Sequence, residues 1–151
     1  MYFTYGEAEI AYLKRRDKRL AEVIDRIGPI ARAVDEDLFS AVVHHIVGQQ
    51  ISTKAQQSIW LRMLDALGTI DADAVIACGR ERLQAFGITF RKADYILDFA
   101  NRVQSGAFDL AAVAAMSDAE AIEALSALKG VGVWTAEMLL LFCLQRPNVF
   151  S

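Results

Sequence analysis

Apolar residues recur along most of the chain with the three- and four-residue spacing of amphipathic helices. This spacing predicts longer helices over residues 7–16, 20–27, 38–48, 52–67, 89–103, 117–128 and 134–144. It also predicts shorter ones after Asp71 and over residues 80–86. No segment alternates convincingly between apolar and polar residues, as a half-buried strand would. The pattern therefore predicts an all-α fold.

Breaking and capping residues divide these helices. Gly28-Pro29 ends the second helix, and Gly48 separates two apolar helices. Ser52 or Thr53 can cap the helix that follows, and the segment 117–120, SDAE, has the pattern of a capping box. A hinge between two lobes is expected between Gly28-Pro29 and Asp37.

Composition limits the class of protein without selecting a function. The chain has 151 residues, of which 54% are hydrophobic, enough for one domain or two small lobes that share a core. No apolar run reaches the length of a membrane span, and the first residues do not have the layout of a secretion signal, so we expect a cytoplasmic protein, associated with the nucleoid in a bacterium. Cys78 and Cys143 form no C-x-x-C pair and are interpreted as reduced structural thiols.

The segment 128–136, LKGVGVWTA, places two glycines directly before a helix start. Gly130 and Gly132 can adopt positive φ angles and allow a tight turn. The unpaired N–H groups of a helix beginning near Val133 would then favour an anion such as a DNA phosphate. An ordinary linker between two helices is the alternative for a bare G-x-G.

Three motifs in the same order carry a family resemblance. L-x-G-V-G-x-x-T-A resembles the helix-hairpin-helix of the DNA glycosylase superfamily, and Trp134 in it resembles the alkylated-base branch, 3-methyladenine DNA glycosylase II. The segments 47–55, VGQQISTKA, and 87–93, GITFRKA, are similar to two further motifs of that branch. The resemblance runs from about residue 2 to residue 151. It implies a multi-helix bundle with two lobes around a cleft: residues 1–36 as an N-terminal lobe, normally completed by C-terminal helices absent here, and residues 37–151 with the hairpin.

The resemblance also implies a set of site residues. Trp134 would stack on an extruded, positively charged base, with Met138 one turn later, although both residue types often serve as core packing. Gln50 would fill the gap that the extruded base leaves in the duplex. The implied DNA contacts are Gln49, Gln50, Ser52, Lys129, Gly130, Gly132 and Thr135, with Ser52 as a plain helix cap being equally consistent.

The sequence gives few expectations about cofactors. The resemblance requires none, but main-chain carbonyls of Ser126, Leu128 and Val131 would hold a structural monovalent cation at the hairpin. No cysteine set for an iron–sulfur cluster is present. His44 and His45 are adjacent on a helix and point about 100° apart, so they are expected at the surface or locally hydrogen-bonded rather than in one site.

Charge argues mildly against a nucleic-acid partner. The chain has 16 Lys and Arg against 19 Asp and Glu, a formal charge of −3, whereas nucleic-acid domains are usually basic. Main-chain amides need no net charge, however, and four basic residues stand beside the motifs: Lys54, Arg91, Lys92 and Lys129. A solvated surface is the alternative for these side chains.

The catalytic group implied by the resemblance is an aspartate about twenty residues after Trp134, which falls beyond Ser151. No acidic residue of the chain matches it, so a protein that ended at Ser151 is expected to be inactive. Helical faces at residues 38–47 and 138–144 would then be partly uncovered and would favour self-association.

Two functions remain open. One is a monofunctional glycosylase that hydrolyses alkylated purines such as 3-methyladenine from double-stranded DNA. The other is a non-catalytic helix-hairpin-helix module that binds DNA. The resemblance disfavours a glycosylase with lyase activity, because it implies that the amine nucleophile of such a protein would occupy the position of Trp134.

Overall fold

The computed structural model describes residues 2–150 and is helical, as the sequence pattern predicts. Two helices lie in the first 34 residues, α1 (Glu7–Arg16) and α2 (Lys18–Ile27). Eight follow: α3 (Leu38–Gly48), α4 (Thr53–Leu67), α5 (Ala72–Cys78), α6 (Arg80–Ala85), α7 (Phe90–Gln104), α8 (Leu110–Ala115), α9 (Asp118–Ser126) and α10 (Val133–Phe142). The described residues contain no named strand, and one isolated bridge joins Tyr2 to Ala33.

Short polar residues start most of these helices by accepting a backbone N–H in the first turn. Ser52 accepts from Ala55, and Ser117 forms the expected capping box with Glu120. The other side chains that cap in this way are Asp17, Asp37, Asp71, Thr89 and Asp109. The helix starts are therefore encoded locally, which is why the periodicity located them well.

Helix α8 was missed by the sequence analysis. Its segment, LAAVAA, has six residues and too few large apolar side chains for a clear period. Asp109 caps its first turn, and Arg146, far along the chain, donates hydrogen bonds to the carbonyl oxygens of Ala114 and Met116 at 2.6 and 2.9 Å. A tertiary contact thus helps to hold a helix that the local pattern hardly specifies.

The chain divides into two compact units, residues 1–34 and residues 35–151. In the first, Asp17 ends α1 and caps α2, and Lys14 pairs with Asp25 across the two helices. Large apolar side chains of this pair are exposed: Tyr12, Leu13, Leu20, Val23 and Ile27. Among the described residues, no helix is both long and apolar enough to span a membrane.

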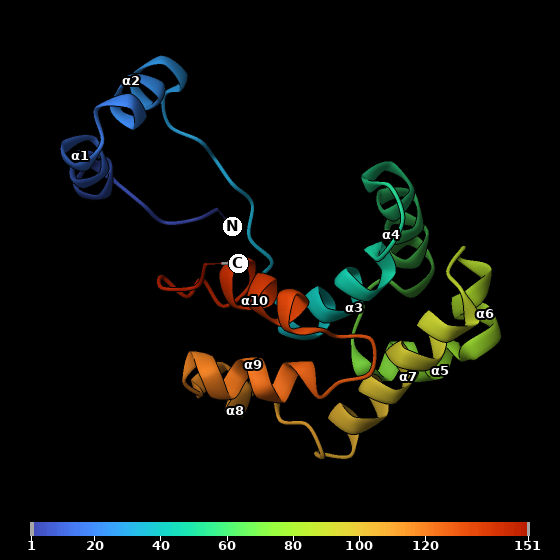
Figure 1. Cartoon of the computed structure of the whole chain (residues 1–151). Helices are drawn as coiled ribbons and strands as arrows, with labels where there is room; N and C mark the ends of the chain where they lie inside the picture. The colour runs from blue at the N-terminus through green and yellow to red at the C-terminus, as the bar shows by residue number, and fades with distance from the viewer. Residues whose placement is uncertain (1, 151) are drawn as a thin grey trace. The chain divides into compact units, whose positions relative to one another are not determined.

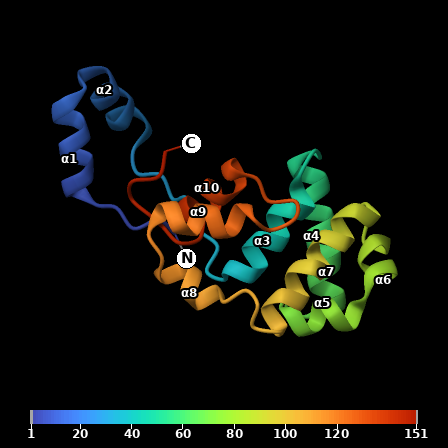
Figure 2. The same cartoon turned by 60° about the horizontal axis from the view of Figure 1, so that its bottom comes forward.

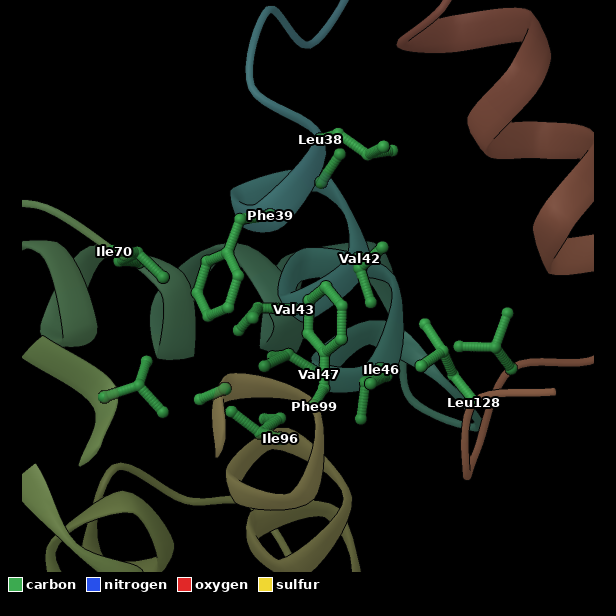
Figure 3. Close-up of a cluster of buried hydrophobic side chains, with 14 of the residues drawn as sticks. Leu38, Phe39, Val42, Val43, Ile46, Val47, Ile70, Ile96, Phe99 and Leu128 are labelled. Atoms are coloured by element: carbon green, nitrogen blue, oxygen red, sulfur yellow. The ribbon is translucent and has the colours of Figure 1, made fainter. Parts of the chain in front are cut away.

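The second unit packs around α3. Figures 1 and 2 show α10 beside α3 with α9 next to α10, while α5, α6 and α7 gather near α4. In Figure 3 apolar side chains of α3 lie beside Phe99 and Ile96 of α7, and Ile46 lies towards Leu128, which belongs to the loop between α9 and α10. Phe39 stacks on Phe99 with ring centroids 4.9 Å apart. Helix α3 therefore links the hairpin to the rest of the core.

This packing corrects one expectation. The face over residues 38–47 was expected to be partly uncovered, but Leu38, Phe39, Val42, Val43, Ile46 and Val47 are all buried in the core cluster of the second unit. The helices α4, α7 and α10 pack against α3. On α10, Leu139 and Leu140 are buried, whereas Met138 and the residues 141–144, the last two of which follow the helix, remain half-buried. Self-association stays a prediction, and α3 supplies no surface for it.

Candidate nucleic-acid interface

The loop between α9 and α10 forms the tight turn that the two glycines predict, but only one glycine needs its conformational freedom. Gly130 has φ 81°, and the Val131 N–H donates to the Leu128 carbonyl at 3.1 Å. Gly132 has φ −94° and ψ 173°, an extended conformation open to any residue, so the expected positive φ at Gly132 is wrong. Gly132 instead occupies the N-cap position of α10.

The head of α10 presents unpaired main-chain donors. Among the described residues, the N–H groups of Val133, Trp134 and Thr135 have no hydrogen-bond partner, and Gly132 offers no capping side chain. Gly132 and Val133 are exposed, and a β-carbon built on Gly132 would meet no atom within 4 Å. Helix dipole and free amides both favour an anion here. The geometry suits a phosphate oxygen approaching this turn.

Trp134 lies in the first turn of α10 with 63% of its surface exposed. An exposed indole of this size has not been used for core packing, which was the alternative interpretation. Met138 follows one turn later and is half-buried. Thr135 is buried, with 7% exposed, so a contribution of this residue to DNA binding is confined to its main-chain N–H.

Lys129 stands just before the turn and is partly neutralised. Its ammonium lies 2.8 Å from a carboxylate oxygen of Asp98 on α7, and Arg102 contacts the other oxygen at 2.9 Å. The hydrogen bond from Lys129, together with the charges of both cations, lowers the pKa of Asp98 below its usual value. Any phosphate bound by Lys129 must therefore compete with this carboxylate.

The loop between α3 and α4 carries the second predicted contact region. Gln50 is exposed and has φ 57°, a left-handed conformation that few non-glycine residues adopt. Its side chain has no hydrogen-bond partner among residues 2–150. Ser52 caps α4 through a 3.2 Å bond from the Ala55 N–H, so its capping role holds, and it stays exposed.

Side chains from other helices close the C-terminal end of α3. Gln56 of α4 donates to the His44 carbonyl at 3.0 Å, and Lys92 of α7 donates to the carbonyls of Val47 and Gln49 at 2.8 and 2.7 Å. A β-carbon on Gly48 would overlap the Gln56 amide, which explains the glycine there. The end carbonyls of α3 are thus satisfied by tertiary contacts.

Gln49 connects the two loops directly. Its side-chain nitrogen donates to the Gly130 carbonyl at 2.6 Å, across 81 residues of sequence. The sequence analysis expected Gln49 to contact DNA, whereas in the structure its side-chain nitrogen binds the hairpin. Figure 2 shows the loop between α9 and α10 next to the junction of α3 and α4. The two candidate contact loops therefore form one surface.

The carbonyl groups expected to hold a cation lie at this turn. The Leu128 oxygen already accepts the Val131 N–H and keeps one lone pair. Among residues 2–150, no backbone N–H of a loop or helix end donates to the carbonyl of Ser126, the last residue of α9, or to that of Val131 in the loop. The oxygens present are chemically suited to a hard monovalent cation, so this site stays a prediction. No group of three His, Cys, Asp or Glu within the described residues could hold a metal ion.

The two histidines are half-buried rather than at the surface. His44 packs against Trp60 with ring centroids 4.5 Å apart. Burial lowers the pKa of both imidazoles, and for His45 the neighbouring His44 lowers it further. His44 therefore contributes a packing contact between α3 and α4. Cys78 and Cys143 are free thiols, as expected, and burial raises the pKa of Cys143 to about 12.

A protein-family model, the HhH-GPD superfamily of base excision DNA repair proteins, matches residues 43–150. This match includes both loops and α7, and it covers more than half of the chain. The chain belongs to the HhH-GPD superfamily. Its helical fold is that of the superfamily's solved structures, as the resemblance predicts.

Individual relatives agree with this assignment. The chain is similar to DNA-3-methyladenine glycosylase 1 of Schizosaccharomyces pombe, with 29% identity over 97% of the chain and 66% of that protein. It matches the crystal structure of a DNA-3-methyladenine glycosidase from Bacillus halodurans with a TM-score of 0.81 and 31% identity, covering 100% of this chain and 70% of that one. The yeast 3-methyladenine DNA glycosylase in complex with abasic DNA matches with a TM-score of 0.74 and 28% identity, over 88% of this chain and 66% of that one.

The chain is shorter than these relatives. It spans about two thirds of the yeast protein and 42–44% of two Bacillus subtilis relatives named as DNA-3-methyladenine glycosylases, one of them as putative. Within this HhH-GPD chain, the sequence analysis named the residues of both loops but missed what holds them. Tyr95 and Gln56 were not singled out, and Lys92 was expected only as one of four basic residues beside the motifs, facing either DNA or solvent. Its place in the motif RKA was the one available signal.

Proposed function

We propose that this HhH-GPD chain forms the DNA-recognition part of a monofunctional DNA glycosylase that excises alkylated purines such as 3-methyladenine from double-stranded DNA. The exposed Trp134 at the head of α10 carries the proposal. An electron-rich indole beside unpaired amides can stack on a cationic base while the amides bind the backbone. The relatives named as 3-methyladenine glycosylases support the same substrate class.

The reaction would be a hydrolysis. The bond between the sugar and the base nitrogen breaks with its electron pair going to the base. The oxygen of a water molecule bonds to the sugar carbon in its place, and one proton of that water is released to solvent. An alkylated purine already carries positive charge and leaves as a neutral base, so binding and extrusion account for much of the selectivity. In the hairpin motif, the resemblance implies that Trp134 occupies the position of the amine nucleophile of a lyase. This favours hydrolysis without a Schiff base.

The DNA-binding step is tested with the 151-residue chain itself. Fluorescence anisotropy compares its affinity for a duplex with an abasic-site analogue and for the undamaged duplex. Gly132→Glu places a carboxylate beside the free amides and should weaken binding to both duplexes by at least about tenfold through repulsion and bulk. Gly132→Ala is the control, because the site has room for a β-carbon and an ordinary φ.

Base release is tested separately with methylated DNA. The resemblance places the catalytic aspartate after Ser151, so release is measured for the 151-residue chain and for a version extended beyond it. Release of 3-methyladenine by the extended protein supports the enzyme. Binding by both versions with release by neither would favour a non-catalytic DNA-binding module, the second candidate function. Unchanged affinity of Gly132→Glu at low salt would contradict the proposed DNA surface.

A further inference from the structure

We propose that Lys92 is a positioning residue for lesion recognition, which holds the loop of Gln50 in register with the hairpin before Trp134. This inference rests on the proposed function and adds to it a residue that does not touch DNA. Lys92 donates hydrogen bonds to the carbonyl oxygens of Val47 and Gln49, the last residues before Gln50. It thereby fixes the main chain on one side of Gln50.

The surroundings of Lys92 distinguish it from a solvated surface lysine. Its side chain is half-buried, and among the described residues no carboxylate pairs with it. Burial lowers the pKa of Lys92, so placing its ammonium here is unfavourable apart from the two carbonyl contacts. Ordering a lysine side chain also costs rotamer entropy. Burial and side-chain ordering both oppose this placement of Lys92. The hydrogen bonds to the two carbonyl groups are therefore the interaction that accounts for it.

Helix α7 carries Lys92 as the first of three contacts on one face. Lys92, Tyr95 and Asp98 follow at intervals of three residues, which places them in a row. Lys92 holds the loop after α3, Tyr95 lies against Gly130, and Asp98 binds Lys129. The loop between α3 and α4 and the loop between α9 and α10 are therefore both held by side chains of one helix, α7.

The backbone conformation of Gln50 depends most strongly on these contacts from α7. Its left-handed φ of 57° is unfavourable for a non-glycine residue, because the β-carbon approaches the following carbonyl oxygen. Such a conformation persists only where the neighbouring structure fixes it. Without the Lys92 contacts, the chain around Gln50 can relax to a commoner conformation, which would move the Gln50 side chain. The hairpin would still be held by Tyr95 and Asp98.

Loss of the Lys92 contacts should therefore affect recognition of the abasic site and leave general DNA binding nearly unchanged. Lys92→Met keeps the length and apolar stem of the side chain but removes its donors. In the 151-residue chain, it should reduce the preference for an abasic duplex over an undamaged one by about tenfold, which corresponds to a loss of about 1.4 kcal/mol of binding free energy. Affinity for the undamaged duplex should change by less than about twofold, because the hairpin amides remain in place.

A spectroscopic readout separates positioning from general stability. A 2-aminopurine placed opposite the abasic site reports whether a protein side chain enters the base stack. The fluorescence change on binding should be present with the unaltered chain and largely lost with Lys92→Met. Thermal unfolding followed by circular dichroism confirms that the variant is folded at the temperature of the assay.

Lys54→Met is the matched control. Lys54 is exposed close to the same loop, and its side chain contacts no loop carbonyl among the described residues. Removing its charge should lower affinity for both duplexes by a common factor and leave the abasic preference and the 2-aminopurine signal unchanged. A loss of preference equal to that of Lys92→Met would show a charge effect and overturn the inference.

The outcomes distinguish this inference from the proposed function. Absence of any abasic preference in the unaltered chain would contradict the proposed function and the inference with it. A preference that survives in folded Lys92→Met contradicts the inference alone. Should Lys92→Met fail to fold, Lys92→Gln, which keeps one amide donor, is measured instead. Partial loss of preference then supports the role of Lys92, and an unchanged preference overturns it.

Discussion

The ring of Tyr95 lies against the main chain of Gly130, where a β-carbon would overlap the ring atom Cδ2. Gly130 also has φ 81°, so both the space and the backbone conformation select glycine. Two residues later, Gly132 has neither constraint. One glycine of the hairpin is therefore structural, and the other leaves room for a ligand at the head of α10.

Gly130→Ala should lower the free energy of unfolding by at least about 1–2 kcal/mol, the cost of a left-handed non-glycine residue before any displacement of Tyr95. Gly132→Ala should change it by less than about 0.5 kcal/mol, as for an open surface position. Urea unfolding followed by circular dichroism measures both. Equal losses for the two variants would contradict the assignment of roles to the two glycines.

Trp134 should be the more accessible of the two tryptophans. It is 63% exposed, whereas Trp60 is half-buried and packs against His44. In a Trp60→Phe variant, the remaining emission should be quenched strongly by acrylamide, and a duplex with an alkylated purine should protect it. The Trp134→Phe variant serves as the comparison. If acrylamide quenches Trp134 fluorescence equally well with and without this DNA, Trp134 does not lie beside the base.

Asp98→Asn should strengthen binding to undamaged DNA. The carboxylate of Asp98 pairs with both Lys129 and Arg102, and its loss frees Lys129 for a phosphate. The slope of log affinity against log salt should steepen by up to about one, the value for one added phosphate contact. Asp94→Asn removes an equal charge from α7, where Asp94 pairs with Arg80. If both variants gain equally, net charge rather than Lys129 is responsible.

Stability should decrease in mild acid because of His44 and His45. Burial lowers the pKa of each imidazole below its usual 6.5, with Asp35 opposing the shift. Below pH 6.5 the unfolded chain therefore binds protons that the folded chain does not, and the free energy of unfolding falls as the pH decreases from about 7 towards the folded pKa values.

The double variant His44→Phe, His45→Gln should flatten this dependence between pH 7 and 5 in urea unfolding. The phenyl ring keeps the packing on Trp60. The paired carboxylates of Asp94 and Asp98, whose pKa values are lowered, titrate at more acidic pH and do not contribute in this range. If the free energy of unfolding of the double variant still falls between pH 7 and 5, groups other than His44 and His45 take up the protons.

The sequence by itself determined the helices and the residues at the two loops. Helix periods and caps such as Ser52 and Ser117 are local properties, because an amphipathic face and a capped first turn depend on residues a few positions apart. The motif around Trp134 likewise identified the family, since its residues are consecutive. Helix α8 was missed because its six residues carry almost no apolar period.

Only the tertiary structure decided how the loops are held. The bond from Gln49 to Gly130 spans 81 residues, and Lys92 reaches carbonyl groups 43 and 45 residues away. Such pairings depend on where helices cross, which no local pattern encodes. They show that Gln49, expected to contact DNA, links the two loops. The same applies to Gly132, whose ordinary φ is set by the start of α10, and to Thr135, which packing turned inward. Side-chain type defines what each group can bind, and the fold selects which partner is within reach.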